Sequence, residues 1–253
     1  MSQLKQKTVT CVFVHGWAMN SSVWDDCIAR LPDWINVVLV DLPGHGSMRD
    51  VNVNSLDELV QALTPLVHRP VVWVGWSLGG LAVLRLAELY PQRVAAALLV
   101  SCSPCFVRRE DWSCAVEAEV FDQFFTNLKD NTEQTLQRFL LLQIKGLPKA
   151  KQLVKQLQKS LQKRGQASEQ ALNTGLEILL KTDMRQALRN IEAELHWYLG
   201  SHDTLVPECL EAELQNRYAQ PHVSCIKGAS HVPFISHEED FIARLISIAE
   251  RFR

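Results

Sequence analysis

Six short runs of apolar residues, separated by longer stretches with helical spacing, constrain the fold of this chain more than any other feature. The runs span residues 10–16, 36–42, 70–76, 96–102, 194–200 and 222–228, and several are apolar almost throughout. A strand that is apolar on both faces is typical of a parallel sheet with helices on each side. The alternation therefore predicts an α/β fold with a doubly wound, mostly parallel sheet.

One interval breaks this alternation. From about Trp112 to about Asn190 the sequence has no strand candidate and only amphipathic helical stretches. We expect residues 112–190 to form an inserted helical cap. Residues 1–111 and 191–253 are then expected to form the α/β core.

A serine follows the third apolar run in a setting that indicates a nucleophile. Gly75-Trp76-Ser77-Leu78-Gly79 matches the pattern G-x-S-x-G, after a predicted strand and before a predicted helix. In such a sharp turn, side chains two residues before and two after the serine would collide unless they are small. The turn lifts the hydroxyl to the carboxyl edge of the sheet, where open α/β sheets bind their ligands. Ser77 is therefore the candidate nucleophile.

A serine needs a base to take its proton, and the base needs an acid to orient it. His231 follows the last apolar run in a glycine-containing loop, and Asp203 follows the fifth run, which gives the order serine, acid, histidine. His237 is the weaker candidate because Ser236 and Glu239 predict a capping box around it. Asp41 precedes the serine, so a turn-capping role is expected for it. The histidines without a motif around them are expected in the core or at the surface; they are His68, His196, His202 and His222.

An oxyanion hole requires two backbone N–H groups near the nucleophile. The residue after the nucleophile, Leu78, is expected to supply one of them. The loop after the first strand is expected to supply the other, from Trp17.

The motifs HGW, DLPGHG, GWSLGG, GSHD and GASH, in this order, resemble the α/β-hydrolase superfamily over essentially the whole chain. GWSLGGL, SPCF, RFLLLQ, GLEILLKTDMRQAL and HVPFISH together resemble, more closely, the pimeloyl-acyl-carrier-protein methyl ester esterase family of biotin synthesis. That resemblance implies a helical cap over the catalytic residues and removal of a methyl ester from a pimeloyl chain held on its carrier protein. Neither a cofactor nor a metal ion is expected. The short segment before the first strand predicts that the usual antiparallel opening strands are truncated.

Carried over residue by residue, the resemblance assigns nucleophile, acid and base to Ser77, Asp203 and His231. It assigns substrate contacts to Trp17, Leu78 and a run in the cap that comprises Phe139, Leu140, Leu141, Leu142 and Gln143. The chain departs from the family at Gln134, where a carrier-contacting arginine is expected. Lys151 and Lys155 also stand in place of arginines, which keeps the charge but loses the bidentate geometry.

A basic stripe in the cap suggests the partner. Between residues 145 and 164 the chain has seven basic residues and no acidic one, and Lys151, Lys155, Lys159 and Lys163 recur every four residues. This spacing places them on one helix face, opposite a leucine face. With no acid in the segment to balance them, we interpret Arg138, Lys151, Lys155 and Lys159 as a docking surface for an acidic acyl-carrier protein.

The amino-acid composition limits the classes of protein to which this chain can belong. Apolar residues make up 47% of the 253 residues, charged residues 21%, and the net charge is −2, as in a soluble globular protein. This balance argues against nucleic-acid or membrane binding, and a monomer is expected. The seven cysteines show no disulfide or zinc spacing, which predicts a reduced, cytoplasmic protein.

Two other functions remain open at the level of sequence. The same three residues would serve a general short-chain carboxylesterase or a C–C bond hydrolase that has no carrier partner. A non-catalytic receptor on the same fold is a further alternative, against which the intact serine, acid and histidine argue.

Overall fold

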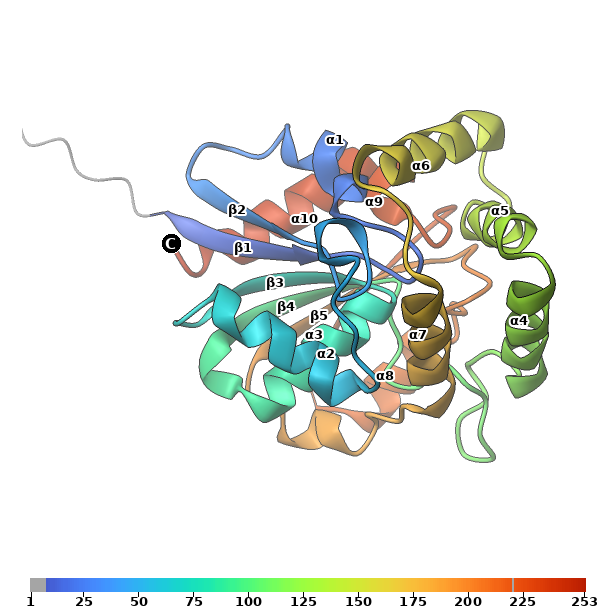
Figure 1. The fold of residues 1–253 in the computed structure, drawn as a ribbon. Coiled ribbons are helices and arrows are strands. Elements are labelled where there is room, and N and C mark those ends of the chain that lie inside the picture. The colour runs from blue at the N-terminus through green and yellow to red at the C-terminus, as the bar shows by residue number, and fades with distance from the viewer. Residues whose placement is uncertain (1–7, 220) are drawn as a thin grey trace, which may run out of the picture.

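The six predicted strands all form, and they build one sheet in which every neighbouring pair is parallel. The computed structural model describes residues 8–219 and 221–253 (Figure 1). The sheet order is β2-β1-β3-β4-β5-β6. The predicted α/β fold class is confirmed. The expected truncation of the antiparallel opening strands concerns mainly residues 1–7, which lie outside the described residues. The strands are β1 Val9–Val14, β2 Ile35–Val40, β3 Val71–Trp76, β4 Val94–Val100, β5 Glu194–Gly200 and β6 His222–Ile226.

The central strands are apolar on both faces because both faces are covered. Along β1, Cys11 and Phe13 contribute to one hydrophobic core, whereas Val12 and Val14 contribute to the other. This is the two-residue period of a strand, with successive side chains on opposite faces. Every residue of β3 is buried, which accounts for its uninterrupted apolar sequence.

Helices of the core lie on both sides of the sheet (Figure 1). The core that contains Val12 is completed by α2 (Leu56–Leu63), α3 (Leu78–Leu89) and α8 (Leu210–Arg217). The core that contains Phe13 is completed by α1 (Asp25–Ile28), α9 (Pro233–Ser236) and α10 (Glu238–Glu250). At the start of α2 the Ser55 hydroxyl accepts a hydrogen bond from the Glu58 N–H, and the Glu58 carboxylate accepts one from the Asn54 N–H.

Four helices follow β4 and precede β5: α4 (Ala118–Asp130), α5 (Thr132–Gln143), α6 (Ala150–Arg164) and α7 (Glu169–Lys181). They lie beyond the carboxyl ends of the strands, at the right of Figure 1. Within the described part of this interval, β structure is limited to isolated bridges. None of the described helices has the length and apolar character needed to cross a membrane.

One disulfide contradicts the expectation drawn from cysteine spacing. Cys114, which precedes α4, is bonded to Cys209 at the start of α8, with their Cα atoms 5.6 Å apart. The two residues are 95 positions apart in sequence. Spacing patterns cannot reveal such a pair, because only the folded chain brings the two segments together.

Helix α3 packs against the sheet without room for a side chain at the glycines of its first turn. A Cβ atom at Gly79 would lie 2.4 Å from the His15 carbonyl oxygen and 2.6 Å from that of Val14, both in the backbone of β1 or just after it. A Cβ atom at Gly75 would lie 2.7 Å from the Gly79 carbonyl oxygen. Glycine at these two positions therefore allows the helix to begin directly above the sheet.

We predict that Gly79→Ala lowers the free energy of unfolding by about 2 kcal/mol, because the added methyl group meets backbone atoms that a rotamer change cannot move. Urea denaturation followed by circular dichroism measures the change. Leu89→Ala, at a 41% exposed position of the same helix, is the control and should cost less than about 1 kcal/mol. Equal losses in the two variants would show that the contact at Gly79 is not tight.

Candidate active site

Ser77 occupies the turn between β3 and α3. Its φ is 53° and its ψ is −116°, in a region that residues with side chains rarely adopt. The Ser77 N–H donates to the Val100 carbonyl at 3.0 Å, and its own carbonyl accepts from the Leu81 N–H at 3.1 Å. These bonds to β4 and α3 stabilise the strained turn and leave the hydroxyl at the carboxyl edge of the sheet.

Asp203 and His231 come together in the loops after β5 and β6. The His231 Nδ1 atom lies 2.7 Å from the Asp203 Oδ2 atom, and both side chains are fully buried. Because a carboxylate only accepts, Nδ1 is the donor, and Nε2 of the neutral ring is left as an acceptor. Nε2 is buried and has no hydrogen-bond partner within the described part of the chain. The ring is therefore arranged to accept a proton at Nε2.

Backbone contacts fix the positions of both residues. The Asp203 Oδ1 atom accepts from the N–H groups of Leu205 at 2.8 Å and Val206 at 3.0 Å. The indole N–H of Trp76, the residue before Ser77, donates to the His231 carbonyl at 2.8 Å. The three sequence-predicted residues are thus placed by adjoining loops at one edge of the sheet.

The loop after β1 places Trp17 over the same edge. Its indole N–H donates to the Leu172 carbonyl in α7 at 2.8 Å, and its ring meets that of Phe139 edge-on, with centroids 4.7 Å apart. A Cβ atom at Gly175 in α7 would lie 2.5 Å from Trp17 Cδ1 and 3.2 Å from Leu78 Cδ2. Helix α7 therefore packs directly against the two residues predicted to form the oxyanion hole.

An apolar pocket opens at Ser77. It is lined by Trp17, Ser77, Phe106, Val116, Val120, Phe121, Phe124, Phe139, Leu176, Leu179 and Leu205. The serine hydroxyl is the only side-chain oxygen among these groups. Sequence reasoning missed most of this lining, because five of the missed residues lie on the apolar faces of α4 and α7 and look the same as ordinary core residues, whereas Phe106, Val116 and Leu205 lie in loops, outside any helical pattern.

The five-residue run in α5 is not brought together around the pocket. Phe139 lines it, but Leu140 packs beside α6, and Leu141, 56% exposed, lines a separate hollow between α4 and α5 together with Leu142. Gln143 is fully buried, its carbonyl accepts from the His231 N–H at 3.1 Å, and its amide atoms have no partner within the described residues. Consecutive residues of a helix are rotated by about 100°, so a continuous run cannot face one cavity.

The basic residues lie on the outer side of α5 and α6. Lys151, Lys155 and Lys159 are exposed, and Arg138 is exposed beside the hollow between α4 and α5. The expectation that no acid balances the stripe is wrong at its end, because Lys163 Nζ lies 2.6 Å from Asp25 Oδ2 in α1. That acid comes from a distant part of the chain and could not be seen in the segment itself.

The predicted capping box at Ser236 and Glu239 does not form. His237 is itself the N-cap of α10, with no side-chain capping bond, while the Ser236 hydroxyl lies 2.9 Å from His237 Nδ1 and 3.3 Å from the Val232 carbonyl. Helix α9 ends at Ser236. The Ser236 hydroxyl therefore bonds at the end of α9 and does not cap α10.

Hydrogen bonds of Asp41 and His15 join the loop after β1 to the loop after β2. Burial alone would raise the pKa of Asp41, but hydrogen bonds from Ser21 and Ser47 hold it at about 2. The expected turn-capping role of Asp41 agrees with these bonds. His15 donates from Nδ1 to the Gly16 carbonyl and accepts the Leu42 N–H at Nε2, which requires a neutral ring.

Comparison with known proteins identifies the family of this chain. Residues 11–245 match the model of the alpha/beta hydrolase family. The chain belongs to the α/β-hydrolase family. A pimeloyl-[acyl-carrier protein] methyl ester esterase from Yersinia pseudotuberculosis is 34% identical over 239 residues, 94% of this chain and 92% of that protein. A Xylella fastidiosa protein of the same name is 39% identical over 240 residues, 92% of each chain.

Solved structures of this α/β-hydrolase fold superimpose closely on the chain. An esterase from Exiguobacterium antarcticum gives a TM-score of 0.85 at 19% identity, covering 96% of this chain and 92% of that one. A bromoperoxidase from Bacillus anthracis gives 0.83 at 20% identity, covering 95% and 91%. Both similarities concern the fold alone.

We predict that stability falls with decreasing pH partly because of His15. Burial, reinforced by the neighbouring His45, lowers the pKa of His15 from 6.5 to about 3. The unfolded chain therefore takes up a proton below about pH 6.5 that the folded chain does not, which costs about 2 kcal/mol between pH 7 and 5. In His15→Gln this loss should shrink by about that amount in denaturation curves at the two pH values. The exposed His68→Gln is the control, and an unchanged loss in His15→Gln would contradict the assignment.

Proposed function

We propose that this protein is a serine carboxylesterase that hydrolyses the methyl ester of pimeloyl-acyl-carrier protein, releasing methanol, as a step of biotin synthesis. The observation that carries the proposal is the buried contact between Asp203 and His231, which leaves His231 Nε2 without a partner among the described residues, together with the apolar pocket that Ser77 lines. The relatives named for this activity, at 34–39% identity over most of the chain, support the substrate.

In the first half of the proposed reaction, Ser77 Oγ attacks the ester carbonyl while His231 Nε2 accepts its proton. Asp203 keeps the ring in the required tautomer and stabilises its protonated form. The backbone N–H groups of Leu78 and Trp17 stabilise the negative oxygen of the tetrahedral intermediate. His231 then donates its proton to the leaving methoxide, and methanol departs from the acyl-enzyme.

In the second half, a water molecule takes the place of methanol. His231 accepts a proton from this water as it attacks the acyl carbon, and the same oxyanion hole stabilises the second intermediate. Its collapse returns the proton to Ser77 and releases the free carboxylate, still attached to its carrier. No cofactor takes part.

We further propose that residues 112–190 act as a cap over a core formed by residues 1–111 and 191–253. Seven of the pocket-lining residues belong to this segment: Val116, Val120, Phe121, Phe124, Phe139, Leu176 and Leu179. A methylated dicarboxylate chain is neutral and apolar along its length, so an apolar lining suits it. The cap thus determines which acyl chains bind.

The carrier protein is proposed to dock on the outer face of α5 and α6. Arg138, Lys151, Lys155 and Lys159 are exposed there, and an acidic carrier with a phosphate-containing prosthetic group complements them. Arg138 borders a hollow that shares Val120 and Phe124 with the Ser77 pocket. This hollow is the route by which the prosthetic group would bring the acyl chain to the serine.

The decisive experiment compares two substrates. Purified protein is incubated with pimeloyl-carrier-protein methyl ester or with a short free methyl ester, and the methanol released is measured. The proposal requires a higher kcat/KM on the carrier-bound ester. Activity on the free ester alone would indicate a general carboxylesterase, and failure of Ser77 to react with a covalent serine probe would indicate a non-catalytic receptor.

We predict that Ser77→Ala loses at least about a thousandfold in kcat on either ester, because no other group supplies the nucleophile. Asp203→Asn should lose a similar factor, since the amide favours the wrong tautomer of His231. Ser236→Ala, whose hydroxyl lies within hydrogen-bond distance of Val232 and His237, is the control and should retain near-normal turnover. Near-normal turnover in Ser77→Ala would overturn the nucleophile assignment.

We predict that replacing Lys151, Lys155 and Lys159 with glutamate lowers kcat/KM on the carrier-bound ester about tenfold or more, because each exposed ion pair contributes up to about 1 kcal/mol. The free ester should be hydrolysed at an unchanged rate. Lys163 is left intact because it is paired with Asp25.

The matched control reverses three exposed charges elsewhere, at Arg69, Arg189 and Arg253. It has the same net charge as the test variant, so a similar loss in both would point to net charge and not to docking. The wild-type preference for the carrier-bound ester should also shrink at high salt, where charges are screened. An equal loss on both esters would assign α6 a purely structural role.

A further inference from the structure

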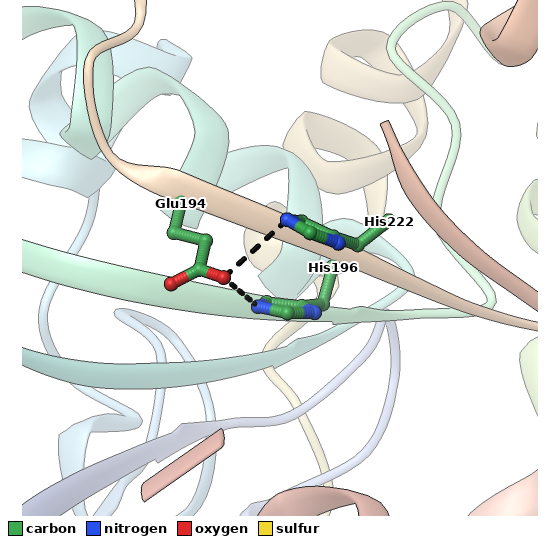
Figure 2. A group of neighbouring side chains, drawn as sticks. All are labelled: Glu194, His196 and His222. Atoms are coloured by element: carbon green, nitrogen blue, oxygen red, sulfur yellow. Dashed lines mark ion pairs between the residues drawn. The ribbon is translucent and has the colours of Figure 1, made fainter. Parts of the chain in front are cut away.

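Three side chains of the types that bind metal ions lie together at the amino ends of β5 and β6, away from Ser77, Asp203 and His231. Glu194 and His196 are the first and third residues of β5, so their side chains point to the same face of the sheet. His222 begins β6 and is paired with His196 in the parallel register. The register thus brings all three side chains side by side (Figure 2).

The distances suit a small ion. The Glu194 Oε1 atom lies 3.1 Å from His196 Nε2 and 3.4 Å from His222 Nε2. One ligand atom from each of the three residues lies within 4.8 Å of the other two. Ligands about 2.0–2.1 Å from a tetrahedral ion are about 3.3–3.4 Å from one another, which is close to the two carboxylate–imidazole distances.

His196 supplies an independent indication of a ligand. Its side chain is 6% exposed, and neither of its ring nitrogens has a hydrogen-bond partner in the described parts of the chain. Nε2 faces the Glu194 carboxylate without the geometry of a hydrogen bond. A buried imidazole with two unsatisfied nitrogens is unusual, and a bound ion would satisfy one of them.

We propose that Glu194, His196 and His222 bind a divalent transition-metal ion of the zinc class, with water at the remaining position. Two imidazole nitrogens and one carboxylate oxygen are ligands that Zn²⁺ prefers, whereas Mg²⁺ and Ca²⁺ prefer oxygen ligands alone. His222 is half-exposed, and with Glu194 it lines a surface hollow that leaves room for the water. The ion would join β5 to β6, the last strand of the sheet.

Two features show what changes when the ion binds. The rings of His196 and His222 are stacked, with centroids 4.5 Å apart and planes 17° from parallel. The half-exposed His222 ring therefore has to turn before both nitrogens point at one ion. Arg251 Nη1 contacts Glu194 Oε1, and its side chain is 53% exposed, so it is free to withdraw. Arg251 neutralises the carboxylate in the absence of the ion and competes with it.

The test is calorimetric titration of the untagged chain with Zn²⁺. The wild type should bind one ion per chain at this site, and His222→Ala and Glu194→Gln should each weaken its affinity at least about tenfold. Arg251→Gln should strengthen it, because a competing cation has been removed. The exposed His68→Ala is the matched control and should bind as the wild type does. Unchanged affinity in both His222→Ala and Glu194→Gln would overturn the proposal.

Two further readouts do not depend on ester hydrolysis. Zn²⁺ at about a hundred times its Kd should raise the Tm of the wild type by about 5–10 °C and that of His222→Ala much less. Co²⁺ in place of Zn²⁺ should give visible absorption without the strong near-ultraviolet band of a thiolate ligand. Such a band would show that a cysteine binds the ion, and it would overturn the assignment. Because the site lies apart from Ser77, these results stand whether or not the esterase proposal holds.

Discussion

The common direction of the six strands is the constraint on which the rest of the structure depends. Since all carboxyl ends meet at one edge, the loops after β1, β3, β5 and β6 bring Trp17, Ser77, Asp203 and His231 to the same place. These residues are scattered over more than two hundred positions of the chain. If any one of these four strands ran antiparallel, its loop would lie at the opposite edge.

Burial strengthens the contact that this geometry makes possible. Asp203 and His231 are excluded from water, and every oxygen of the carboxylate is engaged by a ring nitrogen or a backbone N–H. A buried carboxylate requires such partners, because an unpaired charge is costly in the interior. The same bonds that satisfy the charge also prevent the two side chains from rotating.

Local patterns in the sequence predicted the strands, the turn at Ser77 and the order of serine, acid and histidine. Contacts between distant segments were not predictable in this way. The apolar face of α4 looks like any core face, the disulfide of Cys114 joins segments far apart, and Asp25 reaches Lys163 from another helix. His196 and His222 had no motif around them, because the register that pairs them exists only in the folded sheet.

The disulfide between Cys114 and Cys209 encloses all four helices α4–α7 in a covalent ring together with β5. A cross-link of this kind removes much of the freedom that the intervening residues would gain on unfolding. The cross-link keeps the segment before α4 beside the start of α8, so the two ends of this ring stay together even if the helices between them lose their packing.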